Sequence, residues 1–483
     1  MSTTTGTESR TSAWVLALTS VASLMMALDA TAVTTALSRI RVDLGASMAQ
    51  LEWTMNAYSL TFAVLLMTGA GLGDRFGRKR MFVVGVTLFT AASAACALSP
   101  DAGRLIAARA VQGAGAALAM PLAMALLSAA YPPERRARAL GVFSGLTGLA
   151  VAGGPVVGGA ITQGIAWEWI FWLNVPIGLV MVPLVLRRVP ESKGAAGRFD
   201  AGGLALVTLG ALGLVWGLIR AGDSGWTGAL TLGSLIGGAL LMAAFVGWEL
   251  RSKAPMVPMG LFRSAGFAAG NAAALFMYAA LYGALFFVAQ FLQTGRGEEP
   301  LSAGLHMIPW TAGVIVVAPL AGARVGRIGS RVLTATGLAL QAAGIGWFAL
   351  AADTTVPYWQ LIAPMIVAGV GVSMAMPAAQ ISVINAVAPP QIGKASGVFN
   401  TLRQFGGVLG VAAAAPVFTA LGGYGSAQAF IDGFGPAMGL AAGLSALGAL
   451  SALFIPGRKA TAPRMPAPQV SPPGERDRLS ATR

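Results

Sequence analysis

The sequence predicts an all-α integral membrane protein with fourteen transmembrane helices. Of its 483 residues, 56% are hydrophobic and only 10% are charged, and the mean hydropathy is +0.72. A soluble globular domain carries about 25% charged residues. A chain with so few charges cannot cover its own surface with polar side chains, so we expect most of that surface to face lipid.

The fourteen helices follow from apolar runs of about 20 residues, the length that spans a bilayer. An even number of spans places both ends of the chain on one side of the membrane. In chain order the runs begin near Trp14, Leu51, Met81, Arg104, Arg138, Trp169, Gly202, Ala229, Phe267, Ser302, Arg331, Trp359, Lys394 and Phe434.

The basic residues alternate as this count requires. With the N-terminus inside, 25 of the 32 Lys and Arg residues fall in cytoplasmic segments, five in outer loops and two within helices. Cytoplasmic loops carry an excess of Lys and Arg. We therefore expect a multi-pass protein of the cytoplasmic membrane with both termini in the cytoplasm. Topology also accounts for the net charge of +14, so no nucleic-acid partner is expected.

An internal repeat predicts two six-helix halves separated by two extra helices. GAGAALAMPLAMALL from Gly113 resembles GVGVSMAMPAAQISV from Gly369, and GVF recurs at the same offset of 256 residues, at Gly141 and Gly397. Repeats in a polytopic protein indicate related bundles with a substrate path at their interface. The two helices between Gly202 and Trp248 have no counterpart in the repeat and are interpreted as an insertion.

This organisation divides the chain into five expected segments. They are a cytoplasmic N-terminus (1–13), an N-terminal six-helix bundle (14–190), two inserted helices with cytoplasmic linkers (191–265), a C-terminal six-helix bundle (266–456) and a cytoplasmic tail (457–483). The tail is rich in Pro and charge, and we expect it to be disordered.

Two charged residues interrupt apolar helices. Asp29 lies in MALDATAVTTAL of the first helix, and Arg109 begins RAVQGAGAALAMP of the fourth. A charge at bilayer depth costs about 2.5–3.5 kcal/mol on insertion scales, so both should face the bundle interior. At a rise of about 1.5 Å per residue, both fall in the outer half of the membrane and could pair or alternate. The alternatives are a purely structural ion pair, or an Arg109 that snorkels to the interface.

The loop GDRFGRKR joins the second and third helices. Gly77 permits a tight turn, while Arg75 and Arg78 help to hold the loop in the cytoplasm. Asp74 is expected to meet the positive N-terminal end of a neighbouring helix. That contact could break when the two halves rock. The alternative is a basic loop that only sets the topology.

The fifth helix contains AVAGGPVVGGAI, with Gly154, Pro155, Gly158 and Gly159 in a GP-xx-GG spacing. Small residues let helices approach closely, and Pro removes a backbone hydrogen bond and bends the helix. In a chain with 64 glycines, ordinary Gly-rich packing is the alternative.

A polar and aromatic face is predicted on the helix that begins near Phe267. Asn271, Tyr278, Tyr282 and Gln293 fall on one side at 100° per residue. Such a face could line a cavity for amphipathic substrates, or it could join helices to one another.

These motifs resemble those of the major facilitator superfamily, specifically the fourteen-helix drug:proton antiporters, over nearly the whole chain. The resemblance implies that Asp29 and Arg109 couple transport to protons and that the GDRFGRKR loop is a conformational switch. It also implies that GP-xx-GG is an antiporter motif. Two positions depart from the family pattern, because Ala70 and Ala150 stand where the family has the leading glycines of its loop and fifth-helix motifs.

The implied function is proton-coupled export of amphipathic drugs or secondary metabolites, driven by the proton gradient and without a cofactor. The expected partners are a small amphipathic substrate, protons and the lipid bilayer, and we expect a monomer. The alternatives are a dedicated exporter of one endogenous metabolite, an importer, or a membrane sensor that does not transport.

An enzyme is not expected, because the sequence has no phosphate-binding loop and no Ser/His/Asp set. With one cysteine, Cys96, and one histidine, His306, no disulfide and no metal site are expected either.

Overall fold

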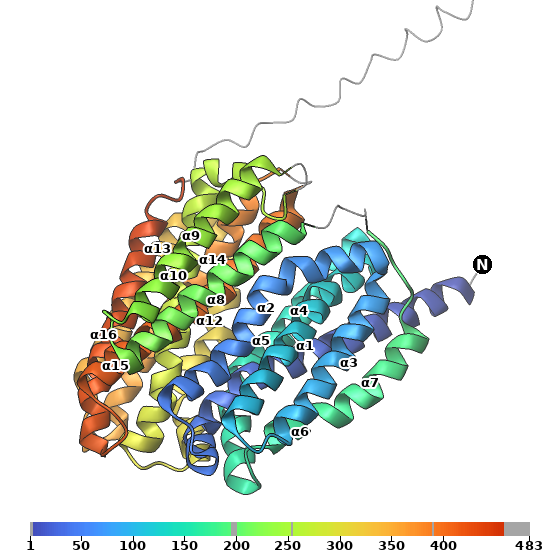
Figure 1. Ribbon diagram of the computed structural model, residues 1–483. Coiled ribbons are helices and arrows are strands. Elements are labelled where there is room, and N and C mark those ends of the chain that lie inside the picture. The colour runs from blue at the N-terminus through green and yellow to red at the C-terminus, as the bar shows by residue number, and fades with distance from the viewer. Residues whose placement is uncertain (1–2, 195–199, 253–254, 389–390, 458–483) are drawn as a thin grey trace, which may run out of the picture.

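The computed structural model describes residues 3–194, 200–252, 255–388 and 391–457 (Figure 1). Within these ranges the chain forms long helices and no strand. Fourteen of the helical spans are long and apolar enough to cross a membrane, which confirms the predicted count. The predicted tail lies outside the described residues except for Gly457.

The first half of the protein contains seven helices that form six spans, because α6 and α7 together make one. The bounds are α1 (Thr3–Leu44), α2 (Met48–Phe76), α3 (Arg78–Ala97), α4 (Ala102–Ala130), α5 (Pro133–Gly164), α6 (Trp169–Trp172) and α7 (Asn174–Arg188). The two inserted helices are α8 (Ala201–Ser224) and α9 (Ala229–Arg251).

The second half also forms six spans, two of them composite. A short 3-10 turn, η1 (Met259–Arg263), precedes it. The bounds are α10 (Ala265–Gln290) with the π-helical turn η2 (Phe291–Gly295), α11 (Pro300–His306) with α12 (Ile308–Ile328), α13 (Ser330–Ala351), α14 (Tyr358–Asn385), α15 (Ile392–Leu421) and α16 (Ala427–Ala452).

The last helix begins earlier than predicted, at Ala427 instead of Phe434. The Ser426 hydroxyl accepts a hydrogen bond from the Ala429 N–H at 3.1 Å and caps the helix. The first two turns carry Gln428 and Asp432, so hydropathy alone assigned them to a loop. Helix α5 likewise begins at Pro133, ahead of the apolar run, because Pro is favoured in the first turn.

The sequence repeat is also a repeat of helix packing. Gly113 of α4 lies so close to α2 that a Cβ there would overlap the Tyr58 carbonyl oxygen. Gly369, its counterpart in α14, approaches the Trp310 carbonyl oxygen of α12 in the same way. The two halves lie side by side in Figure 1, with α1–α7 in one bundle and α10–α16 in the other.

Helix α8 covers the boundary between the two halves. Its Val215 is buried in an apolar cluster with Val64 of α2 and Val408 of α15. Helix α9 packs on α8 and presents exposed apolar side chains such as Leu240 and Leu250 to the surroundings. The inserted pair therefore closes one lateral side of the contact between the halves.

Several contacts join the halves at the end of the bundle opposite the chain N-terminus. The Gln293 Nε2 donates to the Thr35 carbonyl oxygen at 2.9 Å. The Leu301 N–H donates to the Gln163 Oε1 at 3.1 Å. Both bonds link helices of the first half to helices of the second, so this end of the bundle is closed.

Tyr424, in the loop between α15 and α16, adds to this closure. Its hydroxyl donates to the Gln290 side-chain oxygen and lies 3.3 Å from the Met48 sulfur, and the Arg41 guanidinium lies 4.1 Å from its ring centroid. Burial raises the pKa of the Tyr424 hydroxyl above its ordinary value, so the group stays protonated and can donate.

Candidate functional site

The structure brings Asp29 and Arg109 together in the interior of the first half. The Arg109 Nη1 donates to the Asp29 Oδ2 at 2.6 Å, and both residues are 0% exposed. Asp29 comes from α1 and Arg109 from α4, as the depths estimated from the sequence require. Charge-assisted bonds of this length are strong. The pair therefore satisfies two charges that could not remain in the membrane separately.

Two amides complete the environment of the carboxylate. The Gln112 Nε2 donates to the Asp29 Oδ1 at 3.0 Å, and the Asn174 Nδ2 donates to the same oxygen at 2.8 Å. Both amides also donate to the Ser93 hydroxyl, at 2.8 and 3.3 Å. With Arg109, the carboxylate accepts bonds from α4 and α7 and is tied to α3 through Ser93.

Arg109 has partners besides the carboxylate. Its Nη1 also donates to the Gln112 Oε1 at 2.6 Å, and its Nε donates to the Thr54 carbonyl oxygen of α2 at 3.2 Å. Its guanidinium lies 4.4 Å from the Tyr58 ring centroid and 5.7 Å from that of Phe171. Aromatic faces attract a cation at these distances. The arginine is thus anchored to α2 as well as to α1.

This arrangement places one carboxylate at the point where α1, α4 and α7 meet. Asp29 has no exposed surface in this conformation, so water can contact the carboxylate only after these helices move apart. The surroundings of Asp29 therefore depend on the packing of α1, α4 and α7.

The glycine motif of α5 faces two ways. Gly154 and Gly158 lie against Thr31 and Ala32 of α1, where a Cβ would overlap atoms of either residue. Gly159 instead lies against the Pro300 carbonyl oxygen, and the Pro155 carbonyl oxygen lies against Gly304. Pro300 and Gly304 belong to α11, so the motif packs α5 onto its own half with one face and onto the other half with the adjacent face, about 100° around the helix.

A methyl group at Gly159 should therefore prevent the halves from closing at this end. We expect Gly159→Ala to shift the population of the protein toward conformations open at the end opposite the N-terminus, and to slow transport about tenfold or more. Gly153→Ala is the matched control, because a Cβ at Gly153 meets nothing within 4 Å. Labelling rates of a cysteine placed at Ala303 of α11, which is fully buried in this conformation, would report the opening. Equal rates in the two variants would contradict this role.

The basic loop after α2 is held by the segment that follows α7. The Glu191 carboxylate accepts from the Lys79 N–H at 2.9 Å and the Arg80 N–H at 3.3 Å, at the N-terminus of α3. Asp74 instead accepts from the Arg78 Nε at 2.9 Å. In this conformation Asp74 contacts the side chain of the first residue of α3, and its contact with the positive end of a neighbouring helix stays a prediction. Glu191 binds the amides at the start of α3 because the chain folds back after α7.

Gly77 and Arg75 complete the loop. Gly77 has φ +109° and joins α2 to α3, and a Cβ there would overlap the Glu191 carboxylate. A side chain at this position would be strained for both reasons. The Arg75 guanidinium lies 5.3 Å from the Phe76 ring centroid. The assignment of this loop as a conformational switch stays a prediction.

The polar residues that were predicted to share one face of α10 differ from one another in their contacts. Tyr278 and Tyr282 stack on each other, with ring centroids 6.2 Å apart. Asn271 is buried and donates to the Phe267 carbonyl oxygen of its own helix at 2.8 Å. Gln293 lies in η2 and bonds to α1, which is the helix-joining role named as the alternative. A π-helical turn changes the spacing of 100° per residue, so the predicted face does not extend past Gln290.

His306 ends α11 and takes no part in the Asp29 network. Its ring stacks on Tyr358, with centroids 3.6 Å apart, and its Nδ1 lies 2.6 Å from the Glu298 Oε2. The Arg296 Nε donates to the other oxygen of Glu298 at 3.0 Å. This cluster lies beside the contacts that close the end of the bundle.

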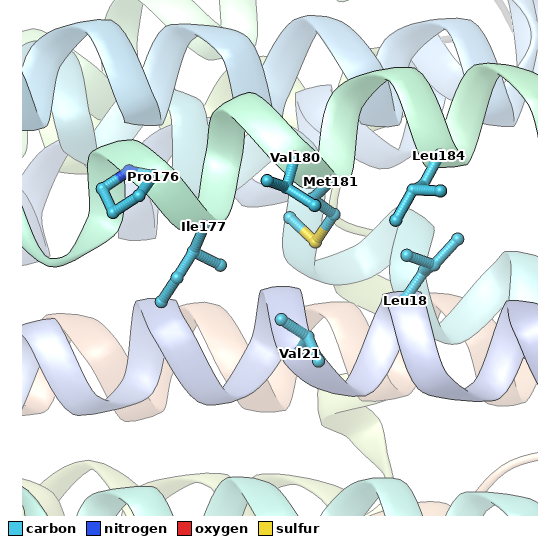
Figure 2. A pocket seen from close by; sticks show the side chains of 7 residues that line it. All are labelled: Leu18, Val21, Pro176, Ile177, Val180, Met181 and Leu184. Carbon is cyan, nitrogen blue, oxygen red and sulfur yellow. The ribbon is translucent and has the colours of Figure 1, made fainter.

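An apolar groove between α1 and α7 lies apart from these polar groups. Figure 2 shows its lining of Leu18, Val21, Pro176, Ile177, Val180, Met181 and Leu184. No polar side chain lines it, and Val180 is largely exposed. The groove is part of the lipid-facing surface and offers nothing that could orient a substrate.

The sequence analysis missed Gln112, Asn174 and Ser93. A signal for Gln112 exists, since it lies three residues after Arg109 and so shares its helix face. Asn174 is a polar residue in the apolar run WIFWLNVPIGLV. Two further acids, Glu52 and Glu249, are each only 2% exposed. Both lie near helix ends, where hydropathy does not predict burial within the protein.

Comparison with known proteins agrees with this architecture. The family model described as Major Facilitator Superfamily matches residues 19–411 and 272–477. Among solved structures, a peptide transporter POT in complex with sulfate superposes with a TM-score of 0.66 and 15% identity, covering 91% of this chain and 93% of that one. At this identity the likeness concerns the fold alone.

Similar sequences are named for export and resistance. The tetracenomycin C resistance and export protein of Streptomyces glaucescens is 37% identical over 393 residues, which cover 80% of this chain and 72% of that protein. The methylenomycin A resistance protein of Streptomyces coelicolor is 34% identical, with 90% and 91% of the two chains covered. With these relatives, the matching family model and fourteen apolar helices, the chain belongs to the Major Facilitator Superfamily of membrane transporters.

Proposed function

We propose that this protein exports amphipathic drugs or secondary metabolites across the cytoplasmic membrane in exchange for protons. The observation that carries the proposal is the Asp29 carboxylate, fully buried at membrane depth and bonded to Arg109, Gln112 and Asn174. Ionisable groups inside membrane proteins mark ion pathways and proton relays. Relatives named for resistance and export support the direction of transport.

The distribution of basic residues supports an orientation with both termini in the cytoplasm. On that assignment, the contacts of Thr35, Gln163 and Tyr424 close the outer end of the bundle. Protons arriving from outside reach Asp29 only after this end opens. A protonated Asp29 no longer forms an ion pair with Arg109, so proton binding can favour one packing of α1 against α4 over another.

The antiporter mechanism needs conformations that open to one side at a time. The face of α5 with Gly159 and Pro155 touches α11 of the other half, where backbone contacts can form and separate without rearranging large side chains. The close contacts of Gly154 and Gly158 keep α5 on α1. The motif thus supports rigid halves that rock against each other.

Transport into everted vesicles tests the proposal directly. Vesicles with and without the protein would be energised to acidify their interior, and uptake of tetracenomycin C would be followed. We expect uptake that stops when a protonophore collapses both the pH difference and the electrical potential. Uptake that persists after both are collapsed would overturn proton coupling.

A dedicated exporter of one metabolite is the second candidate, because two relatives are named for single antibiotics. A susceptibility panel of cells with and without the protein separates the two. Protection against several unrelated amphipathic compounds supports the broad exporter. Protection against one compound alone supports the dedicated one.

A further inference from the structure

A second arginine lies at membrane depth without an acidic partner. Arg403 of α15 is 11 residues from the start of its helix at Ile392, which places it roughly 16 Å, or about a third of the way, along a span of 30 residues. Its Nε is buried and has no hydrogen-bond partner. None of the ion pairs among the described residues includes Arg403.

Aromatic side chains surround this cation. The Arg403 guanidinium lies 5.5 Å from the Tyr278 ring centroid, and Tyr278 stacks on Tyr282. In the first half, the Arg109 guanidinium likewise lies over a tyrosine ring, that of Tyr58. Each half therefore has an arginine beside a tyrosine, and transporters of this architecture hold substrates between their halves.

The two arginines differ in what neutralises them. Arg109 is bonded to Asp29, to an amide and to a backbone carbonyl oxygen. A buried arginine with a structural role is expected to have such partners, because an uncompensated charge in the interior is strongly destabilising. Arg403 is instead only partly buried; its guanidinium interacts with the Tyr278 side chain, and its Nε has no hydrogen-bond partner. No acidic side chain among the described residues forms an ion pair with it, so its charge is free to bind an anion.

We infer that Arg403, Tyr278 and Tyr282 form the recognition site for substrates that carry a carboxylate on an aromatic body. This inference rests on the proposed export function and names the substrate class of that activity. The guanidinium offers a planar set of donors that matches a carboxylate, and the tyrosine rings offer faces on which an aromatic body can stack. A cationic substrate would be repelled by Arg403.

Binding to the purified full-length protein in lipid nanodiscs tests the site. The probes are anthracene-9-carboxylate, its methyl ester and 9-anthracenylmethylammonium, measured by fluorescence anisotropy at pH 7. Wild type should bind the carboxylate about tenfold or more tightly than the ester. Arg403→Gln should weaken carboxylate binding about 10- to 100-fold and ester binding less than about twofold, since bonds to a charged group contribute about 1.5–3 kcal/mol. Arg403→Lys should fall between them.

Arg331→Gln, an exposed arginine of the same half, is the matched control and should leave all three affinities unchanged. The thermal midpoint of unliganded Arg403→Gln should stay close to that of the control, because Arg403 is partly exposed and forms no ion pair among the described residues. Equal affinity of wild type for acid and ester, loss of both probes in Arg403→Gln, or a lowered midpoint would each overturn the site. These measurements need no proton gradient, so their failure is distinguishable from failure of vesicle exchange.

Discussion

Asp29→Asn is expected to reduce proton-driven export to the background of vesicles that lack the protein. The carboxylate accepts from Arg109, Gln112 and Asn174. Asparagine has nearly the same shape and keeps one acceptor oxygen, but it cannot bind and release a proton. Recovery of the fluorescence of a pH-sensitive dye, quenched in acidified everted vesicles, after substrate addition measures the loss. Substrate counterflow, which needs no net proton movement, should survive to a larger extent.

The matched control is Asp43→Asn. Asp43 lies on the same helix, but its side chain is exposed and pairs with Arg39 one turn away at 3.2 Å. The same chemical change there should leave export within about twofold of wild type, because exposed pairs contribute about 0–1 kcal/mol. Asp29→Glu keeps a titratable group and should retain part of the activity. Wild-type exchange in Asp29→Asn would rule out the coupling role.

Much of the fold could be predicted because hydropathy alone determines which segments enter lipid. A helix also has a fixed rise per residue, so depth could be estimated for Asp29 and Arg109 before any contact was known. Asp29 and Arg109 had few possible partners other than each other, because the residues around them in the sequence are apolar. The pairing of Asp29 with Arg109 followed from the estimated depth of each residue and from the energetic cost of a lone charge in the bilayer.

The remaining features depend on how helices rotate about their axes and where loops return. The positions of Gln112 and Asn174 against one carboxylate oxygen require three helices to meet, and no local pattern encodes that meeting. Glu191 reaches the start of α3 across more than 100 residues of chain. The start of α16 was missed because its cap and polar first turns resemble a loop.

Arg109→Gln is expected to destabilise the protein by about 3–5 kcal/mol, the cost of leaving one member of a buried ion pair without its partner. Asp29→Asn should cost a similar amount, because it leaves Arg109 unpaired. The double variant removes both charges and should be more stable than the sum of the single losses predicts, with a coupling energy at or above the usual range of about 0.5–3 kcal/mol. Unfolding in detergent measures each free energy.

Arg39→Gln and Asp43→Asn provide the reference cycle at the surface, because the side chains of Arg39 and Asp43 are 62% and 35% exposed. The coupling energy between these two substitutions should be below about 1 kcal/mol.

The double variant also separates stability from function. If the pair only held α1 against α4, restoring stability would restore export as well. If Asp29 carries the proton and Arg109 responds to it, the stable double variant should still fail to exchange protons for substrate. Arg109→Lys should lie between wild type and Arg109→Gln, since it keeps the charge but cannot reach Asp29, Gln112 and the Thr54 carbonyl oxygen together. Strictly additive losses in the cycle would show that Asp29 and Arg109 act independently, despite the 2.6 Å between them.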